Sequence, residues 1–244
     1  KPSKALDVHM GIDGQNFDCV RCHTTEMHNI AGRVYTRPAA TDRKSLIEDD
    51  LTPKITCESC HSATPHAAGS KANDHTDRVA CQTCHIPEVA RELPTKMTWD
   101  WSQAGKLKDG KPYKTEDEFG KHDYLTIKGA FKWAKNVTPE YFWYNGVLKS
   151  VTAQDMIDPG QVVPVSAPVG SPEDADSRIY PFKVHRGKQP YDKVNKTLLV
   201  PLLSGDDGYW KTLDWQRALS TGQASVGLPY SGQFDFVATS YVFP

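Results

Sequence analysis

The chain has 244 residues, of which 38% are hydrophobic and 24% charged, and its formal net charge is −1. This length fits one large domain or two small ones, and the composition is not that of a disordered chain. The near-neutral charge gives no support to nucleic-acid binding, and no apolar run approaches the roughly 18 residues that a membrane span needs. The polar segment that begins at Lys1 does not resemble a secretory signal, and a processed chain or a piece of a longer one would begin in the same way.

The first part of the chain, residues 1–97, holds every cysteine and most of the histidines. Short helices are expected over residues 43–50, after Thr41 or Asp42 as the cap, and over residues 88–93, before a proline. The rest of this part has no clear hydrophobic period and is expected to form loops around prosthetic groups.

The second part, residues 98–244, has no cysteine and is rich in aromatic, proline and glycine residues. Residues 141–144 predict a strand that runs into an Asn-Gly turn. Residues 213–220 predict a helix with Thr212 as its cap and Gly222 at its end.

These elements predict a mainly α fold with much irregular structure and few short strands. We expect residues 1–97 to hold the prosthetic groups and residues 98–244 to form a loop-rich cover, the two making one compact unit. Prosthetic groups would then supply much of the core that residues 1–97 are too short to build for themselves.

The cysteines form three pairs of identical spacing, and a histidine follows each pair directly. The motifs are Cys19-Val20-Arg21-Cys22-His23, Cys57-Glu58-Ser59-Cys60-His61 and Cys81-Gln82-Thr83-Cys84-His85. Cys-x-x-Cys-His is the attachment signature of haem c. Two thiols on one turn can bond to the two vinyl groups of one porphyrin, and the next residue places an imidazole under the iron. The sequence therefore predicts three covalent haem c groups, with His23, His61 and His85 as proximal ligands.

Two other chemistries use paired cysteines. The spacing from Cys57 to Cys84 is close to that of a zinc ribbon, but it would leave Cys19 and Cys22 without partners. Structural disulfides or thioredoxin-like dithiol chemistry would account for the pairs. Because neither chemistry explains a histidine after all three pairs, haem attachment is the preferred interpretation.

Distal iron ligands are expected among the six remaining histidines. These candidates are His66, His75, His28, His9, His122 and His185. His28 and His66 each follow a proximal histidine by five residues, too close to reach the far face of the same haem but able to reach a neighbouring one. Ligation by Met10, Met27, Met97 or Met156 would raise the reduction potential. With six spare histidines, bis-histidine ligation and low potentials are the better prediction.

Basic residues gather around His185 in the second part of the chain. They are Lys183, Arg186, Lys188, Lys193 and Lys196. A solvated surface explains such a cluster, and so does a rim that attracts an anionic substrate. His122, His185 and Lys188 are therefore the candidate catalytic residues for substrate contact.

Several longer strings resemble the octahaem tetrathionate reductase family. The matching strings cover residues 84–87 and 94–101, residues 131–137 and 139–146, and residues 178–183 and 185–192. They run through most of the chain after the first motif and are more specific than the cysteine motifs alone. The family carries eight haems, whereas this chain has three motifs. We therefore expect the central part of a longer polypeptide, with a shortened relative or one chain of a split complex as alternatives.

The resemblance implies a multihaem c-type cytochrome that passes electrons through closely packed haems. It implies an oxidoreductase, as part of a periplasmic or extracellular bacterial reductase of tetrathionate or of nitrite and hydroxylamine. Its expected partners are an electron-donor protein or quinol-linked cytochrome and a small oxyanion, and an oligomer would be compatible with this role. One family haem takes a lysine in place of its second histidine, and this sequence does not locate that lysine. The alternative function is an electron conduit in which every iron has two histidines and no catalytic site exists.

Overall fold

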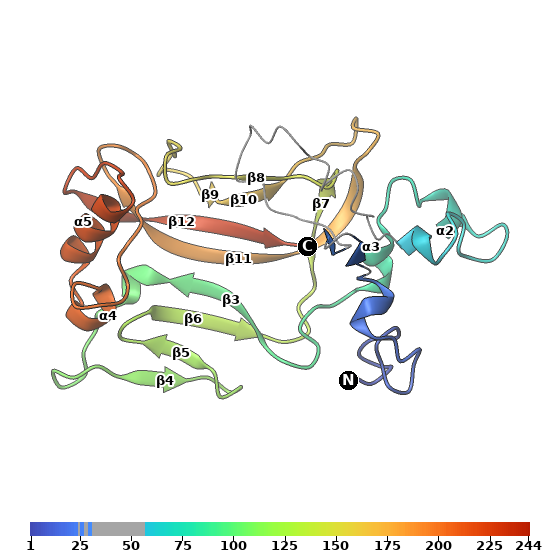
Figure 1. Ribbon diagram of the computed structural model, residues 1–244, viewed down its shortest axis with the longest axis horizontal. Helices are drawn as coiled ribbons and strands as arrows, with labels where there is room; N and C mark the ends of the chain where they lie inside the picture. Colours follow the sequence, from blue (N-terminus) through green and yellow to red (C-terminus); the bar gives the residue numbers. More distant parts are fainter. Residues whose placement is uncertain (24, 27–28, 31–56) are drawn as a thin grey trace. The chain divides into compact units, whose positions relative to one another are not determined.

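The computed structural model describes residues 1–23, 25–26, 29–30 and 57–244, which form two compact units (Figure 1). Unit 1 comprises Lys1–Pro87, Tyr141–Leu148 and Pro168–Pro181. Unit 2 comprises Glu88–Glu140, Lys149–Ala167 and Phe182–Pro244. Each unit is treated below by itself.

Strands dominate the secondary structure, with 30% of residues in strands and 15% in helices. The prediction of a mainly α fold is therefore wrong. Its error lies in the aromatic-rich second part, which was assigned to loops. In Gly129–Ala134, for example, Phe131 and Trp133 alternate with the exposed Lys132. Aromatic side chains at every second position favour a pleated strand with one buried face.

Within the described residues, the largest sheet is mixed and has eight strands in the order β4-β5-β6-β3-β11-β12-β9, with β7 also paired to β11. The strands are β3 (Thr95–Asp100), β4 (Lys114–Glu116), β5 (His122–Leu125), β6 (Gly129–Ala134), β7 (Glu140–Tyr144), β9 (Val163–Pro164), β11 (Arg178–Asp192) and β12 (Phe234–Phe243). The longest pairing, antiparallel β11 with β12, runs from Lys183–Phe243 to Asp192–Phe234. β3 pairs with β6 in antiparallel and with β11 in parallel orientation.

Shorter elements complete the described chain. They are β1 (Thr25–Glu26), β2 (Asn29–Ile30), β8 (Leu148–Ser150), β10 (Ser166–Pro168), η1 (Cys19–Arg21), η2 (Cys57–Ser59), η3 (Trp101–Gln103), α2 (Lys71–Asp74), α3 (Cys81–His85), α4 (Tyr209–Thr212) and α5 (Trp215–Ser225). None of the helices in the described ranges has the length and apolar character of a membrane-crossing segment.

The helix predicted over residues 213–220 exists, but its bounds differ. Leu213 adopts a left-handed conformation with φ of 55°, which ends α4 before α5 begins. Asp214 caps α5 by accepting a hydrogen bond from the Arg217 backbone N–H, so Thr212 is not the cap. The helix also continues past Gly222 to Ser225.

The other predicted elements have different outcomes. The strand at residues 141–144 is confirmed within β7. The prediction of a helix at residues 88–93 is wrong, because Val89 forms an antiparallel β-bridge with Val137 and Ala90 has a φ of 60°. The helix at residues 43–50 lies outside the described residues.

The core of unit 2 has an aliphatic and an aromatic part. Ile157, Val163, Leu198 and Val237 form the aliphatic cluster. The aromatic part centres on Trp215, whose ring lies 4.0 Å from that of Tyr209, 5.4 Å from Phe236 and 5.8 Å from Trp101, measured between centroids. Burial of such rings supplies much of the stabilising free energy of a domain.

Helix α5 packs by one face. Its buried residues Ala218, Leu219, Gly222 and Gln223 recur at helical spacing. A Cβ at Gly222 would lie 2.1 Å from the Val200 carbonyl oxygen, so this close approach requires glycine. Next to it, the buried Gln223 side chain accepts a hydrogen bond from the Val200 N–H and donates one to the Pro229 carbonyl.

Candidate functional site

Each Cys-x-x-Cys-His motif folds into a single helical turn in unit 1. In the first, the Cys22 N–H donates to the Cys19 carbonyl at 3.2 Å and the His23 N–H donates to the same carbonyl at 2.8 Å. The second motif repeats both distances, with Cys57 as the acceptor. The third forms α3. In every case both thiols and the imidazole belong to one turn, as the attachment chemistry requires.

All six thiols are free, and the side chains around them are largely open to solvent. Cys57 and Cys81 are half-buried, whereas the other four cysteines are exposed. Burial raises the pKa of the Cys57 thiol, and the neighbouring Cys81 raises it further through charge and hydrogen bonding. The first cysteines of the second and third motifs therefore lie side by side.

The third motif is fixed to the first residues of β11. The Ala80 N–H and the Thr83 hydroxyl both donate to the Ile179 carbonyl, at 3.0 and 2.8 Å. Upstream, the Arg78 guanidinium donates to the Asp174 carbonyl at 3.2 Å and lies 4.8 Å from the centre of the Trp143 ring. These contacts orient α3 within unit 1.

The second motif has its own anchor. Glu58, inside the motif, forms an ion pair with Arg178 at 3.0 Å. This pair and the contacts of α3 attach the second and third motifs to neighbouring residues of β11.

Two histidine pairs stand out in unit 1. His61, the histidine of the second motif, faces His9 with ring centroids 6.1 Å apart and ring planes at 65°. His85, the histidine of the third motif, lies beside His66 with ring centroids 6.0 Å apart and ring planes at 14°. All four side chains are exposed.

A hydrogen bond orients the His66 ring. Its Nδ1 lies 3.3 Å from the Asn73 side-chain oxygen, which can only accept, so Nδ1 carries the proton. The Asn73 amide nitrogen donates to the carbonyls of His66 and Ala67, which fixes the orientation of the amide. In the neutral imidazole this tautomer leaves the lone pair on Nε2, which is the atom that would bind a metal.

The other candidate ligands have different environments. His23 ends the first motif turn. His75, at the end of α2, is exposed and has no imidazole ring partner of this kind within the described part of the chain. His28 lies outside the described residues.

His122, His185 and Lys188 belong to unit 2. His185 is half-buried on β11, its Nδ1 lies 3.2 Å from the Lys96 carbonyl oxygen, and burial lowers its pKa. Successive strand residues point to opposite faces, so Lys183 shares a face with His185, whereas Arg186 and Lys188 lie on the other. The basic cluster that surrounds His185 in the sequence is therefore divided between two faces of the sheet.

Comparison with known proteins fits this picture. The sequence profile described as "Cytochrome c bacterial" matches residues 96–244, more than half of the chain. The chain belongs to the bacterial cytochrome c family. The match covers the part without cysteines, so the family assignment and the haem motifs are independent observations.

A solved structure is similar to almost the whole of this cytochrome. It is an octahaem cytochrome c from Shewanella oneidensis, with 44% sequence identity and a TM-score of 0.86. The match covers 99% of this chain and 53% of the Shewanella chain, so this cytochrome spans about half the length of that relative. The likeness to the octahaem family predicted from the sequence is confirmed. No curated protein matches the chain.

The family implies covalently bound haem c and electron transfer. The residues of unit 1 fit that group. Two imidazoles bound to one metal ion at about 2 Å each have ring centroids roughly 6 Å apart. Both histidine pairs have this separation, and free thiols stand on the same turns as His61 and His85.

Sequence reasoning missed the specific partners. His9 and His66 were only two of six candidates, and nothing in their spacing joins His9 to His61. No sequence signal links Asn73 to His66.

Proposed function

We propose that this cytochrome carries three haem c groups on its three motifs. Their thioether bonds would be to Cys19 and Cys22, Cys57 and Cys60, and Cys81 and Cys84, with His23, His61 and His85 as proximal ligands. The observation that carries the proposal is the pair of imidazoles at His61–His9 and His85–His66, each at the spacing of two axial ligands.

The residues of the third site have separable roles. His85 and His66 would be the two residues that hold the iron. Asn73 keeps the proton of His66 on Nδ1 and so presents Nε2 to the metal. Arg78 and Thr83 hold the turn that carries the thiols. Haem c supplies a one-electron carrier whose potential the ligands and the surroundings set.

Close haem packing is part of the proposal. Cys57 and Cys81 are neighbours, so these two thiols would hold the second and third haems at adjacent attachment sites. The chemistry that the two groups would supply there is one-electron transfer. Residues 1–97 would then form the tri-haem region and residues 98–244 its cover.

The reaction proposed for the whole protein is reduction of tetrathionate, or of nitrite and hydroxylamine, in the periplasm or outside the cell. Support comes from the octahaem likeness and from the strings shared with the tetrathionate reductase family. Covalent c haem is also attached outside the cytoplasmic membrane. An electron-donor protein or quinol-linked cytochrome would be the partner.

A second function, pure electron conduction, is favoured at two of the haems. His61 and His85 each have a second imidazole at ligand spacing, which would leave no open position on iron. We infer that the second and third haems conduct electrons and that substrate reduction, if it occurs, takes place at another iron.

Mass spectrometry of the native holoprotein tests the attachment. We expect each motif peptide to carry one haem, and the colour to stay with the polypeptide after acid-acetone extraction. Loss of the colour, or zinc in place of iron, would contradict the proposal.

Substitution of the distal histidines tests the ligand pairs. His66→Ala and His9→Ala should each convert one low-spin iron to high spin, whereas the exposed His75→Ala should not. In electron paramagnetic resonance, the nearly parallel rings of His66 and His85 predict a rhombic signal, and the crossed rings of His9 and His61 a more anisotropic one. Unchanged spin states in both distal variants would refute these ligand assignments.

The reductase and the conduit predict different responses of the haem absorption spectrum to added nitrite or cyanide. Addition of nitrite or cyanide to the native protein should shift the absorption of one haem if the protein is a reductase. Reoxidation of the reduced protein by tetrathionate, nitrite or hydroxylamine would support the same function. Six-coordinate spectra that none of these compounds changes would support the conduit.

A further inference from the structure

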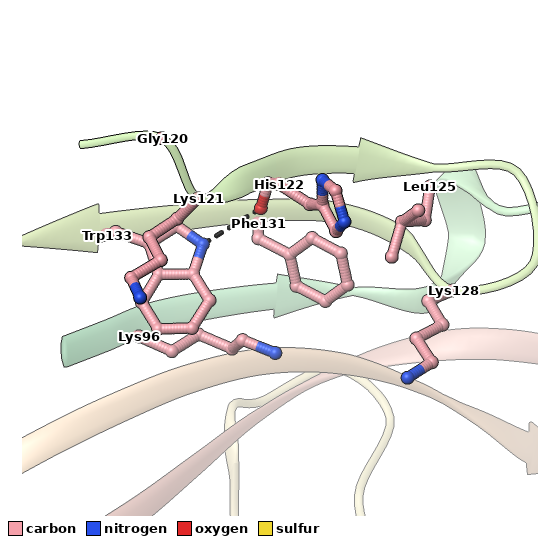
Figure 2. Close-up of a pocket in the computed structure, with 8 residues that line it drawn as sticks. All are labelled: Lys96, Gly120, Lys121, His122, Leu125, Lys128, Phe131 and Trp133. Carbon is pink, nitrogen blue, oxygen red and sulfur yellow. Dashed lines mark hydrogen bonds between the residues drawn. The ribbon is translucent and has the colours of Figure 1, made fainter. Parts of the chain in front are cut away.

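A basic pocket lies in unit 2, on the part of the sheet built from β3, β5 and β6 (Figure 2). Its volume is about 280 Å³, and it is lined by Lys96, Gly120, Lys121, His122, Leu125, Lys128, Phe131 and Trp133. In this view Lys96 and Lys128 lie on one side of the Phe131 ring and His122 on the other. The four basic side chains are all half-buried.

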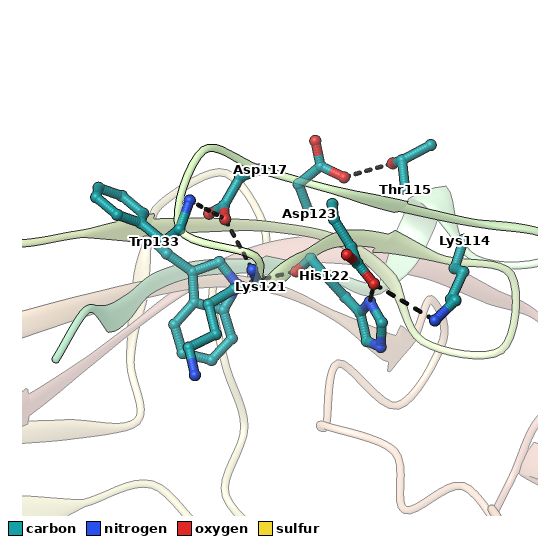
Figure 3. Close-up of polar contacts among 9 residues, drawn as sticks. Lys114, Thr115, Asp117, Lys121, His122, Asp123 and Trp133 are labelled. Atoms are coloured by element: carbon teal, nitrogen blue, oxygen red, sulfur yellow. Dashed lines mark hydrogen bonds and ion pairs between the residues drawn. The ribbon is translucent and has the colours of Figure 1, made fainter.

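Hydrogen bonds between side chains and backbone groups hold the rim of the pocket (Figure 3). The Asp117 carboxylate accepts hydrogen bonds from the Phe119 and Lys121 N–H groups, both at 2.9 Å, and so fixes the turn between β4 and β5. The Trp133 indole N–H donates to the His122 carbonyl at 2.9 Å. Lys121 and His122 are therefore presented by a constrained segment.

Aromatic rings hold Lys96 at the floor of the pocket. Its ammonium lies 4.0 Å from the centre of Phe131, 4.3 Å from Trp99 and 5.1 Å from Trp133. Ring faces attract a cation but do not neutralise it. Burial lowers the pKa of Lys96, and Lys128 and Lys183 lower it further by repulsion. The surroundings of Lys96 therefore disfavour its charged form.

No carboxylate lines the pocket, and Lys96, Lys121 and Lys128 have no ion pair within the described residues. Glu116, outside the lining, lies 3.4 Å from both His122 Nδ1 and Lys114 Nζ, and the Asp117 carboxylate is bonded to the Lys121 backbone N–H. His122 Nδ1 is itself buried and has no hydrogen bond of ordinary geometry among the described groups. Like charges at short range in a half-buried site repel strongly. An anion in the pocket would remove this cost.

We propose that this pocket binds a small inorganic oxyanion with two negative charges, such as a sulfate-like tetrahedral ion. Lysine ammonium groups act as point charges, which suits a compact tetrahedral anion, whereas arginine, absent from the lining, suits planar carboxylates. The volume exceeds that of one such ion, and Leu125 and Phe131 keep part of the wall dry. The inference goes beyond the proposed function, because none of the cysteine motifs takes part.

Titration calorimetry with sulfate on the oxidised holoprotein, at constant ionic strength, tests the site. Lys121→Gln and Lys128→Gln should each weaken binding by about tenfold, because each removes a charge-assisted contact. Lys132→Gln is the matched control, since Lys132 lies on β6 between Phe131 and Trp133 but is exposed on the other face. Its affinity should stay within about twofold of the parent.

Crystals of the holoprotein soaked in selenate give a second readout. We expect an anomalous selenium peak among Lys121, His122 and Lys128. Equal affinities in the three variants, or a selenium position outside the pocket, would overturn the proposal. Both measurements use oxidised protein without electron transfer, so their failure would leave the reductase proposal untouched, and inactivity towards tetrathionate or nitrite would leave the anion site untouched.

Discussion

Units 1 and 2 differ in what fills their interiors. Among the described residues, unit 1 contributes only Ala80, Tyr144 and Leu148 to the buried hydrophobic side chains. Unit 2 contributes the others, including the fully buried Tyr209 and Leu219. Unit 1 also exposes most of its thiols and imidazoles, whereas unit 2 pairs long strands in a regular sheet.

One chain therefore builds two kinds of core. Unit 2 has a core of its own apolar side chains, whose burial stabilises a folded domain. Unit 1 has helices of three to five residues, too short to be stable alone. If the proposed haems are present, their porphyrins replace the missing apolar side chains of unit 1.

The largest effect is expected from removal of the haem attachment. In a protein with all six cysteines changed to alanine, unit 1 should lose its amide protection, because its apolar filling is gone. Unit 2 should keep the protection of β11 and β12. Hydrogen exchange followed by mass spectrometry measures both units in one sample. Equal protection of unit 1 with and without haem would refute the contrast.

A cavity in the core of unit 2 should have a smaller effect than haem removal, but a measurable one, on the free energy of unfolding. Leu219→Ala removes a fully buried side chain from α5, and we expect the free energy of unfolding to fall by about 3 kcal/mol. The matched control is Leu6→Ala in unit 1, where the side chain is 36% exposed and the loss should stay below about 1 kcal/mol. Chemical denaturation of the holoproteins gives both values, and equal losses would contradict the comparison.

Acid sensitivity should depend on Asp192, at the end of β11. Burial alone would raise the pKa of this carboxyl, but hydrogen bonds from Asn195, Ser231 and Val194 lower it below the ordinary 3.8. A depressed folded pKa means that the stabilisation is present above pH 3.8 and is lost as the pH falls below it. Asp192→Asn should cost about 2 kcal/mol at pH 7 and less in acid. A cost that does not change with pH would refute this account.

The last effect is expected at alkaline pH. Burial raises the pKa of Tyr209 to about 12, and its hydroxyl has no hydrogen bond of ordinary geometry among the described residues. Between pH 10 and about 12 the unfolded chain loses this proton before the folded one. Stability should therefore fall by up to about 1.4 kcal/mol per pH unit.

Tyr209→Phe isolates this contribution. The variant should be nearly as stable as the parent at pH 7 and less sensitive to alkali, as measured by denaturation at several pH values. Tyr141→Phe, at an exposed position in unit 1, is the control and should not change the alkaline slope. The same slope in parent and Tyr209→Phe would contradict the role of burial.

The candidate site was predictable only in part. The spacing of cysteines and histidines specifies a chemistry, because attachment depends on residues within one turn. The pairing of His66 with His85 depends on how two turns pack, and His9 joins His61 across about fifty residues of chain. Most strands escape prediction because the many prolines and glycines in residues 98–244 indicate loops, although aromatic alternation in β6 favours a sheet.

Three haem motifs, a strand at residues 141–144 and the likeness to octahaem cytochromes all follow from the amino-acid sequence, because each depends on neighbouring residues. The folded arrangement is needed to see which histidines face each other and that Lys96, Lys121 and Lys128 share one pocket. These groupings join distant residues through strand pairing and burial. The stability of these groupings depends on the whole fold, so no local sequence pattern predicts them.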